Sequence, residues 1–307
     1  MNENMFRAKF IINPVAGAKS SIRKWKHIYD ILRHIGLRFD FEITEGTGHA
    51  IELAREAVSK GYENIYAVGG DGTINEVANG ILLSENPTGC TLGIISTGTG
   101  SDFIRSIGIP RNYIQACLSL GNPCRSLLID TGLIEYWRNG KRGKRFFVNT
   151  AGVGLDAAVV DATNRLPKLF GGTIPYLAGL TKTLLAYKNR IVKIKFNSRE
   201  NEVKVVSVIV ANGKYAGGGM KFAPAAQLND GLLDIIVVND MSKFKLIKSF
   251  SRVYKGTHLE LPEIHCYQTV KIDIIPRDRT LVYADGELLG ESPVNISIMP
   301  LKLKVAL

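Results

Sequence analysis

The sequence is poor in cysteine and has none of the patterns that cysteines form at disulfide or zinc sites. Its four cysteines, Cys90, Cys117, Cys124 and Cys266, are scattered over 307 residues, without a C-x-x-C pair or a histidine at zinc spacing. This favours a reducing compartment and argues against a metal cluster held by sulfur. The first ten residues, MNENMFRAKF, contain no apolar core, so no secretory leader is expected.

A long hydrophobic run is also missing. The most apolar stretch, residues 170–187, contains Pro175 and Lys182 and is marginal in length for crossing a bilayer. We expect a helical segment at 174–188 that is buried or lies at an interface. No basic motif interleaved with aromatic residues and no recognition helix is present, so nucleic acid is not expected as a partner.

Charge is distributed unevenly along the chain. Residues 1–130 contain 13 Lys or Arg against 13 Asp or Glu, whereas residues 131–307 contain 26 against 15 and account for the whole net charge of +11. Only the second part is therefore expected to face an anionic partner, such as a membrane surface or an anionic substrate. A basic surface that merely aids solubility is the alternative.

The order of apolar segments predicts two domains. Residues 1–130 alternate short apolar strands with helical patterns, which is typical of a doubly wound α/β domain. Residues 131–307 contain many short strand-like segments, interrupted by helical patterns at 174–188 and 242–254, and predict a mostly β, sandwich-like domain. The last strand is expected either to stay in this domain or to return to the first.

One glycine-rich loop follows a buried strand and opens a helix. The stretch VGGDGTINEV, residues 68–77, places Asp71 at the carboxyl end of that strand, where open α/β sheets bind ligands and helix N–H groups favour anions. Thr73 and Glu76 have capping-box spacing, so Thr73 is the expected N-cap. A carboxylate repels phosphate, so Asp71 fits a nucleotide bridged by magnesium. The alternative is that Asp71 only caps the turn.

Two further strand-end loops resemble the first. TLGIISTGTGSDFIRSIGIP, residues 91–110, again runs from a strand through a Gly/Thr-rich turn to an acidic residue, Asp102, and a helix. INPVAGAKS, residues 12–20, adds glycines and Lys19 but lacks Walker A spacing. Two aspartates at the ends of strands in one sheet are hard to explain by turn chemistry alone.

Five motifs in this order resemble the catalytic domain of the diacylglycerol kinase family of lipid kinases, especially its soluble, YegS-like bacterial members. They are NPVAG (13–17), GGDGTINEV (69–77), LGIISTGTGSDF (92–103), NDGLLD (229–234) and ADGE (284–287). GGDGT alone also occurs in NAD kinases and phosphofructokinases, but the ordered set covers nearly the whole chain.

The resemblance implies a role for each matched residue. ATP is expected to contact Thr44, Gly69, Gly70, Asp71, Gly72, Thr73, Ile74, Asn75 and Thr99. Asp71 and Asp102 would organise catalytic Mg²⁺ and nucleotide, with Asp130 as a further acidic candidate. A structural Mg²⁺ would take the Asp230 carboxylate and the carbonyls of Gln227 and Leu232. Glu287 would be the general base for the acceptor hydroxyl.

For Asp230 and Glu287, an ordinary N-D-G turn and a solvated turn carboxylate are the respective alternatives. This chain also departs from the family pattern. It has Ser101 where asparagine is usual, Gln227 where an apolar residue is usual, and Lys19 one residue late in its motif. The first change concerns nucleotide contacts, and the last puts the role of Lys19 in doubt.

The resemblance implies a cytoplasmic enzyme that works at the inner face of the membrane on a lipid substrate. The basic second domain would contact the anionic surface, with RNGKRGKR, residues 138–145, as its densest cluster. Residues 166–190 are apolar with basic ends and could line an acyl groove or enter the membrane interface. Helix packing in the core is the favoured single explanation. A homodimer is possible.

Diacylglycerol is the expected acceptor, giving phosphatidic acid. A phosphatidylglycerol, sphingoid or ceramide kinase with the same site is the nearest alternative, and a soluble-substrate kinase of the NAD kinase type is a more distant one. The non-enzyme alternative is a nucleotide-sensing or nucleic-acid-binding protein with a degenerate kinase site.

Overall fold

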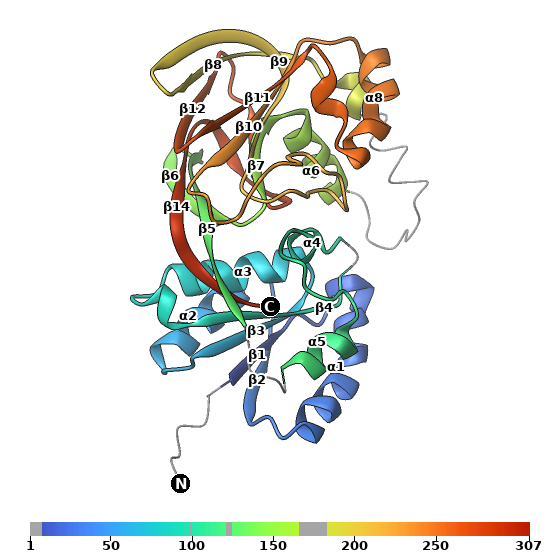
Figure 1. Ribbon diagram of the computed structural model, residues 1–307. Coiled ribbons are helices and arrows are strands. Elements are labelled where there is room, and N and C mark those ends of the chain that lie inside the picture. The colour runs from blue at the N-terminus through green and yellow to red at the C-terminus, as the bar shows by residue number, and fades with distance from the viewer. Residues whose placement is uncertain (1–7, 99, 121–124, 166–182) are drawn as a thin grey trace. The chain divides into compact units, whose positions relative to one another are not determined.

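The computed structural model describes residues 8–98, 100–120, 125–165 and 183–307 (Figure 1). The chain divides into two units, a first unit of Met1–Thr131 with Pro300–Leu307 and a second unit of Gly132–Met299. The expected α/β domain followed by a mostly β domain is confirmed.

The first unit is built on a parallel sheet with strand order β14-β4-β3-β1-β2, in which β14 takes part through Lys304 and Val305. Its other elements are β1 (Ala8–Ile12), α1 (Ala16–His34), β2 (Phe39–Ile43), α2 (His49–Ser59), β3 (Asn64–Gly69), α3 (Asp71–Leu82), β4 (Thr91–Ser96), α4 (Asp102–Ile107) and α5 (Tyr113–Ser119). The central strands β1, β3 and β4 are almost entirely buried, as their continuous apolar sequences require when helices cover both faces.

Helices α1 and α5 pack side by side, and so do α2 and α3. The apolar stripe of α1, with Trp25, Ile28 and Leu32, packs against Phe10 and Tyr66 of the sheet. These positions recur every three or four residues, the helical period that gives α1 its one buried side.

The start of α3 differs from the sequence prediction. The helix begins at Asp71, with Gly70 as its N-cap, and Thr73 lies inside the first turn. The proposed capping box is therefore wrong. The Glu76 carboxylate instead accepts hydrogen bonds from the backbone N–H groups of Gly48 (2.9 Å) and Ala50 (3.3 Å), so it caps the first turn of α2.

The strands of the second unit pair in a closed antiparallel circuit, β9-β7-β13-β14-β12-β8-β9. Strand β10 adds to β9, β11 adds to β10, and β6 pairs with β5. The bounds are β5 (Ser126–Arg138), β6 (Lys141–Phe147), β7 (Thr150–Gly154), β8 (Arg190–Phe196), β9 (Arg199–Ala211), β10 (Leu233–Asn239), β11 (Ile264–Thr269), β12 (Lys271–Pro276), β13 (Leu281–Ala284) and β14 (Glu287–Ala306).

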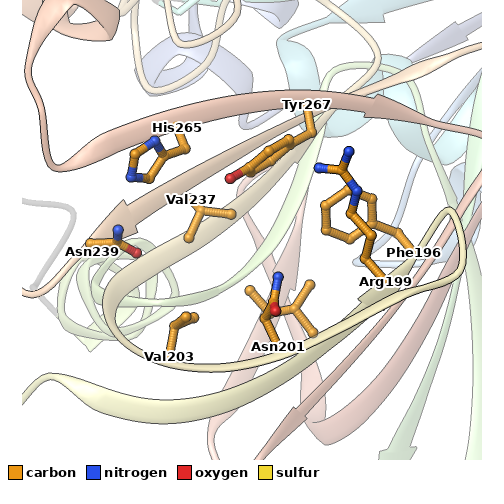
Figure 2. A pocket seen from close by; sticks show the side chains of 9 residues that line it. Phe196, Arg199, Asn201, Val203, Val237, Asn239, His265 and Tyr267 are labelled. Atoms are coloured by element: carbon orange, nitrogen blue, oxygen red, sulfur yellow. The ribbon is translucent and has the colours of Figure 1, made fainter.

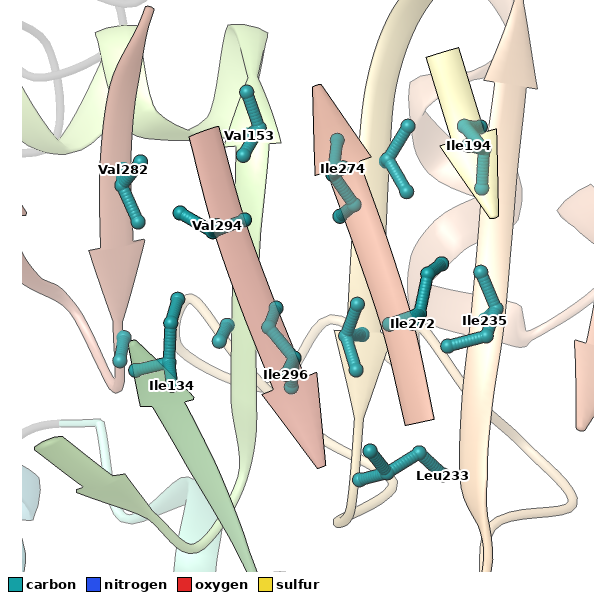
Figure 3. Close-up of a cluster of buried hydrophobic side chains, with 14 of the residues drawn as sticks. Ile134, Val153, Ile194, Leu233, Ile235, Ile272, Ile274, Val282, Val294 and Ile296 are labelled. Carbon is teal, nitrogen blue, oxygen red and sulfur yellow. The ribbon is translucent and has the colours of Figure 1, made fainter. Parts of the chain in front are cut away.

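Alternating apolar residues of these strands fill one interior. Figure 3 shows side chains of β5, β7, β8, β10, β12, β13 and β14 pointing into it, among them Ile134, Ile235 and Ile274, which are fully buried. The period of two in the sequence predicted this inward face.

The second unit also contains α6 (Leu155–Arg165) and α8 (Lys243–Lys255). The sequence pattern at 242–254 predicted α8 correctly, whereas α6 was missed. The helical segment expected at 174–188 lies largely outside the described residues, apart from a short helical stretch at 183–186.

Candidate active site

The glycine loops after β3 and β4 touch each other at the carboxyl edge of the parallel sheet. The backbone N–H groups of Thr97 and Gly98 donate to the Gly69 carbonyl at 2.8 and 3.3 Å. A Cβ atom added to Gly98 would lie 2.6 Å from the Cα of Gly70. No side chain fits where Gly98 meets Gly70, so the two loops contact each other through backbone atoms at this point.

The carboxylates of Asp71 and Asp102 flank one glycine. A Cβ atom on Gly100 would lie 2.6 Å from Asp71 Oδ2 and 3.8 Å from Asp102 Oδ2. Asp71 Oδ1 accepts a hydrogen bond from the Phe103 N–H at 3.2 Å, and Arg105 lies 3.5 Å from Asp102 Oδ1. The structure thus brings together the two aspartates that the sequence singled out. It also gives Asp71 a structural contact with the first turn of α4.

Other predicted nucleotide contacts have structural partners. Thr73 Oγ1 accepts a hydrogen bond from Asn13 Nδ2 (3.0 Å), Ile74 is fully buried, and Asn75 Oδ1 accepts from Asn79 (3.1 Å). Gly70, Asp71 and Gly72 are the accessible part of this loop.

Thr44 lies at the end of β2, where its N–H donates to the Ile12 carbonyl at 2.8 Å and its side chain is buried. Thr99 lies outside the described residues. Thr44 therefore extends the sheet ladder to the same edge at which the glycine loops meet.

The loop after β1 turns in a left-handed path. Gly17, Ala18 and Lys19 have φ values of 58°, 53° and 67°, which is unfavourable for the latter two residues. A Cβ atom on Gly17 would lie 2.3 Å from the Thr97 carbonyl oxygen, and Arg23 donates to the carbonyls of Ala18 and Lys19. This close approach requires glycine at position 17.

Two features of these loops bear on the sequence predictions. Ser101 has a left-handed φ of 57°, a region that asparagine favours, and its Oγ lies 2.9 Å from Ser96 Oγ. Asn13, which connects the loops after β1 and β3, was not recognised as a site residue, although its position after an apolar strand is a usable signal.

Asp130 lies in β5 and is fully buried. Its Oδ1 accepts a hydrogen bond from the Leu301 N–H at 2.7 Å. This contact ties β5 to the C-terminal part of β14 within the first unit. It gives Asp130 a structural role, and its expected part in the acidic group with Asp71 and Asp102 stays a prediction.

In the second unit, Glu287 begins β14 after a tight turn from β13. Asp285 and Gly286 have φ values of 44° and 80°, as a two-residue hairpin turn with both central residues left-handed requires. The Asp285 carboxylate accepts N–H groups of Val148, Asn149 and Thr150 at 2.8–3.0 Å and so fixes the turn.

The Glu287 carboxylate itself is paired. Arg145 donates to its Oε2 at 2.9 Å, and the side chain of Arg145 is less exposed than that of Glu287. Arg145 belongs to the basic cluster 138–145, which forms the β5–β6 hairpin. In that hairpin Lys144 pairs with Glu135 (2.7 Å), and Arg142 lies over the Trp137 ring. Three of the five basic residues of this cluster are therefore engaged within the hairpin or with Glu287.

The loop before β10 contains the proposed structural metal ligands. Asp230 Oδ1 accepts a hydrogen bond from the Leu232 N–H at 3.0 Å around Gly231, which has a φ of 73°. Gln227 is exposed, and Asp230 and Leu232 are partly exposed. Burial and the charge of Asp230 raise the pKa of the nearby Asp234 to about 6.

Both acidic sites offer the hard oxygen donors that magnesium prefers. Within the described residues, no group of three or more His, Cys, Asp or Glu side chains is arranged to hold a metal. A magnesium ion at either site would need water, backbone carbonyl or phosphate oxygens to complete its coordination, which is usual for this ion.

A separate pocket of 220 Å³ lies in the second unit (Figure 2). Its lining residues are Ile194, Phe196, Arg199, Asn201, Val203, Val237, Asn239, His265 and Tyr267. None of the predicted site residues lines it, so this pocket is distinct from the groups described above.

Comparison with known proteins places the chain in a family. A family model for the diacylglycerol kinase catalytic domain matches residues 7–129, and one for the YegS C-terminal NAD kinase beta sandwich-like domain matches residues 149–307. Within the described residues, no helix combines the length and apolarity needed to cross a membrane.

Individual relatives agree with the family models. A diacylglycerol kinase of Bacillus subtilis is 28% identical over 94% of this chain and 92% of its own length. A probable YegS-like lipid kinase of Chromohalobacter salexigens is 31% identical over 71% of this chain and 67% of its own. A crystal structure of a Bacillus anthracis protein assigned as a diacylglycerol kinase superposes with a TM-score of 0.80 and 26% identity, covering 99% and 96% of the two chains.

Two domains of this kind, with paired aspartates at the glycine loops, define a phosphotransferase that uses an alcohol group as acceptor. The chain belongs to the diacylglycerol kinase family of lipid kinases, which includes the YegS-like enzymes.

Proposed function

We propose that this lipid kinase transfers the γ-phosphoryl group of ATP, with Mg²⁺, to the free hydroxyl of diacylglycerol and forms phosphatidic acid. The observation that carries the proposal is the pair of carboxylates, Asp71 and Asp102, facing Gly100 beside two glycine loops that meet through backbone. The names of the curated relatives support diacylglycerol as the acceptor.

The glycine loops are the proposed nucleotide site. Gly70, Asp71 and Gly72 are accessible at the start of α3, and the N–H groups of a helix start favour phosphate oxygens. Gly69, Thr73, Ile74, Asn75, Thr44 and Thr99 are further proposed contacts. When bound, the metal–nucleotide complex supplies the phosphoryl donor and neutralises charge that develops during transfer.

Each carboxylate has its own part in the proposal. Asp71 and Asp102 would hold the catalytic magnesium, with Arg105 limiting the excess negative charge at Asp102. Glu287 would accept the proton of the acceptor hydroxyl, and Arg145 would hold the Glu287 carboxylate in position. Asp230, with the carbonyls of Gln227 and Leu232, would hold a structural magnesium that stabilises the loop before β10.

The excess of basic residues in the second domain supports work at an anionic surface. We therefore propose a cytoplasmic enzyme that associates peripherally with the inner face of the membrane. A homodimer is compatible with this proposal but is not required by it.

The test is phosphoryl transfer from radiolabelled ATP, with Mg²⁺, to mixed micelles that contain diacylglycerol, phosphatidylglycerol, ceramide or sphingosine. NAD is the soluble control acceptor, and Glu287→Ala is the inactive control. Label in phosphatidic acid, lost in the variant, is expected. Transfer to another lipid would correct the acceptor, and transfer to NAD alone would refute lipid phosphorylation.

A further inference from the structure

Helix α8, coloured orange in Figure 1, has an amphipathic sequence, with one side half-buried and the other exposed. Its thirteen residues, KFKLIKSFSRVYK, include five Lys or Arg and no Asp or Glu, and none of them is fully buried. The helix is well defined at both ends. Ser242 caps its N-terminus through the Lys245 N–H (3.3 Å), and Gly256, with a φ of 75°, ends it.

One side of α8 holds it to the protein. Leu246 packs against the buried cluster that includes Ala223, Ile236 and Met241. Lys245 pairs with Glu263, and Arg252 lies 3.8 Å from Glu260. These contacts fix which side of the helix faces outward.

The outward side carries large apolar side chains. Phe244 is 77% exposed, Ile247 49% and Tyr254 48%. At about 100° per residue, these three positions fall within one sector of about 80°, centred about 120° around the helix from Leu246. Exposing a phenylalanine to this extent on a basic helix is characteristic of helices that lie in a membrane interface.

The cations beside this sector are available for a partner. Lys248 lies one turn from Phe244 and Lys255 lies beside Tyr254, both on the outward side. Neither forms an ion pair with any residue that the structure describes. An acidic residue is missing from the whole helix, so nothing on it would repel an anionic surface.

We propose that α8 docks on an anionic phospholipid bilayer. Phe244, Ile247 and Tyr254 enter the interface between headgroups and acyl chains, and Lys248 and Lys255 contact lipid phosphates. The charge of the helix favours a lipid surface over a second copy of this chain, because two such basic faces would repel each other. The reason for docking, access to a lipid substrate, rests on the proposed function. Docking itself is measured without ATP or catalysis.

The experiment measures binding of the full chain to vesicles by flotation. Vesicles of phosphatidylglycerol and phosphatidylcholine in equal parts are compared with vesicles of phosphatidylcholine alone. Phe244→Ser is expected to weaken binding to the anionic vesicles about tenfold. Lys248→Ser and Lys255→Ser are each expected to weaken it about fivefold, and this lysine contribution should vanish at high salt.

Matched variants lie in the first unit. Leu118→Ser removes an apolar side chain of α5 that is 50% exposed, and Lys26→Ser removes an exposed lysine of α1. Both are expected to bind vesicles as the unaltered chain does. Equal binding by the α8 variants and the unaltered chain would overturn the proposal. So would a Phe244→Ser variant that changes only the oligomeric state in gel filtration.

A direct readout of insertion is the emission of Phe244→Trp in a Trp25→Phe, Trp137→Phe background. Brominated lipids are expected to quench it, and unchanged emission would contradict insertion. Activity separates docking from catalysis. The Phe244→Ser variant should lose activity on diacylglycerol in vesicles but keep it on a dispersed short-chain diacylglycerol. If no variant phosphorylates either acceptor while Phe244→Ser still loses vesicle binding, the proposed function fails and the docking surface stands.

Discussion

Replacing Asp156 by asparagine is expected to stabilise the second unit at neutral pH. Asp156 lies in the first turn of α6, and its Oδ1 accepts a hydrogen bond from Ser207 Oγ at 2.9 Å. Its Oδ2 is buried and accepts no hydrogen bond from the residues that the structure describes. Burial raises the pKa of Asp156 to about 6, although the Ser207 and Tyr283 hydroxyls favour the ionised form. An ionised carboxylate is therefore costly at this position.

The magnitude follows from linkage. The ordinary pKa of the carboxyl is 3.8, so the folded state binds the proton more tightly than the unfolded state by about 2 pKa units, or about 3 kcal/mol. Between pH 3.8 and 6 the folded state holds more protons, so the free energy of unfolding falls as the pH rises through this window. Above about pH 6 the folded state bears the whole cost of burying the ionised Asp156 carboxylate. Below about pH 4 the carboxyl is protonated and this cost disappears.

The assay is urea unfolding at pH 4 and pH 7.5, followed by tryptophan fluorescence. The chain has two tryptophans, Trp25 in the first unit and Trp137 in the second. A Trp25→Phe background therefore reports on the second unit alone, which matters because two domains need not unfold together. Asp156→Asn should raise the free energy of unfolding by about 2 kcal/mol at pH 7.5, after allowance for a weaker Ser207 contact, and by much less at pH 4.

The control variant is Asp161→Asn, which removes a partly exposed carboxylate of the same helix and should leave stability nearly unchanged at both pH values. Asp156→Asn that is no more stable than the parent at pH 7.5 would refute the reasoning. A stabilisation of equal size at both pH values would also refute it, because it could not come from the carboxylate charge.

Three further predictions concern the loops. Gly100→Ala should reduce phosphoryl transfer at least tenfold, because the added Cβ would lie 2.6 Å from Asp71 Oδ2 and displace that carboxylate. Gly46→Ala, whose Cβ meets open space, should keep most activity, and equal losses in the two variants would contradict this account. Asp285→Ala should lower the free energy of unfolding of the second unit by about 2–4 kcal/mol, because three backbone N–H groups lose a charged acceptor. Thermal unfolding measures this change, and a loss below about 1 kcal/mol would contradict a stabilising role for these three hydrogen bonds. Arg145→Ala should lower kcat more than it raises KM for the lipid, because it removes the ion pair that positions the Glu287 carboxylate. Arg145→Lys should keep part of kcat, and a change in KM alone would exclude the positioning role.

Periodicity in the sequence was sufficient to predict the fold class. The alternation of short apolar strands with helical patterns in residues 1–130 predicted the α/β domain, and the many short strand-like segments of residues 131–307 predicted the mostly β domain. These signals are local, because each strand or helix shows its buried face in its own sequence.

Contacts between distant segments could not be predicted in this way. The Thr73–Glu76 spacing matched a capping box, yet Glu76 caps α2 because the packing of α2 beside α3 brings the Gly48 and Ala50 N–H groups within reach. Similarly, the pairing of Arg145 with Glu287 joins residues 142 positions apart. Nothing in the local sequence distinguishes Arg145 from the other basic residues of its hairpin.

Within the candidate site, the sequence indicated Asp71 and Asp102 but not how they are held. Their convergence on Gly100 depends on the left-handed backbone of Ser101 and on the hydrogen bond from the Phe103 N–H to Asp71. Glycine at position 100 is visible in the sequence, but the reason for it, the space that the Asp71 carboxylate occupies, requires the folded chain.

The most direct test of the central claim compares the unaltered chain with Glu287→Gln in transfer of the γ-phosphoryl group from ATP to a dispersed short-chain diacylglycerol. The account predicts that label enters the lipid and that kcat in the variant falls by about a hundredfold or more, as loss of a general base does, while ATP binding is unchanged. A variant that phosphorylates the lipid at the rate of the unaltered chain would contradict the account.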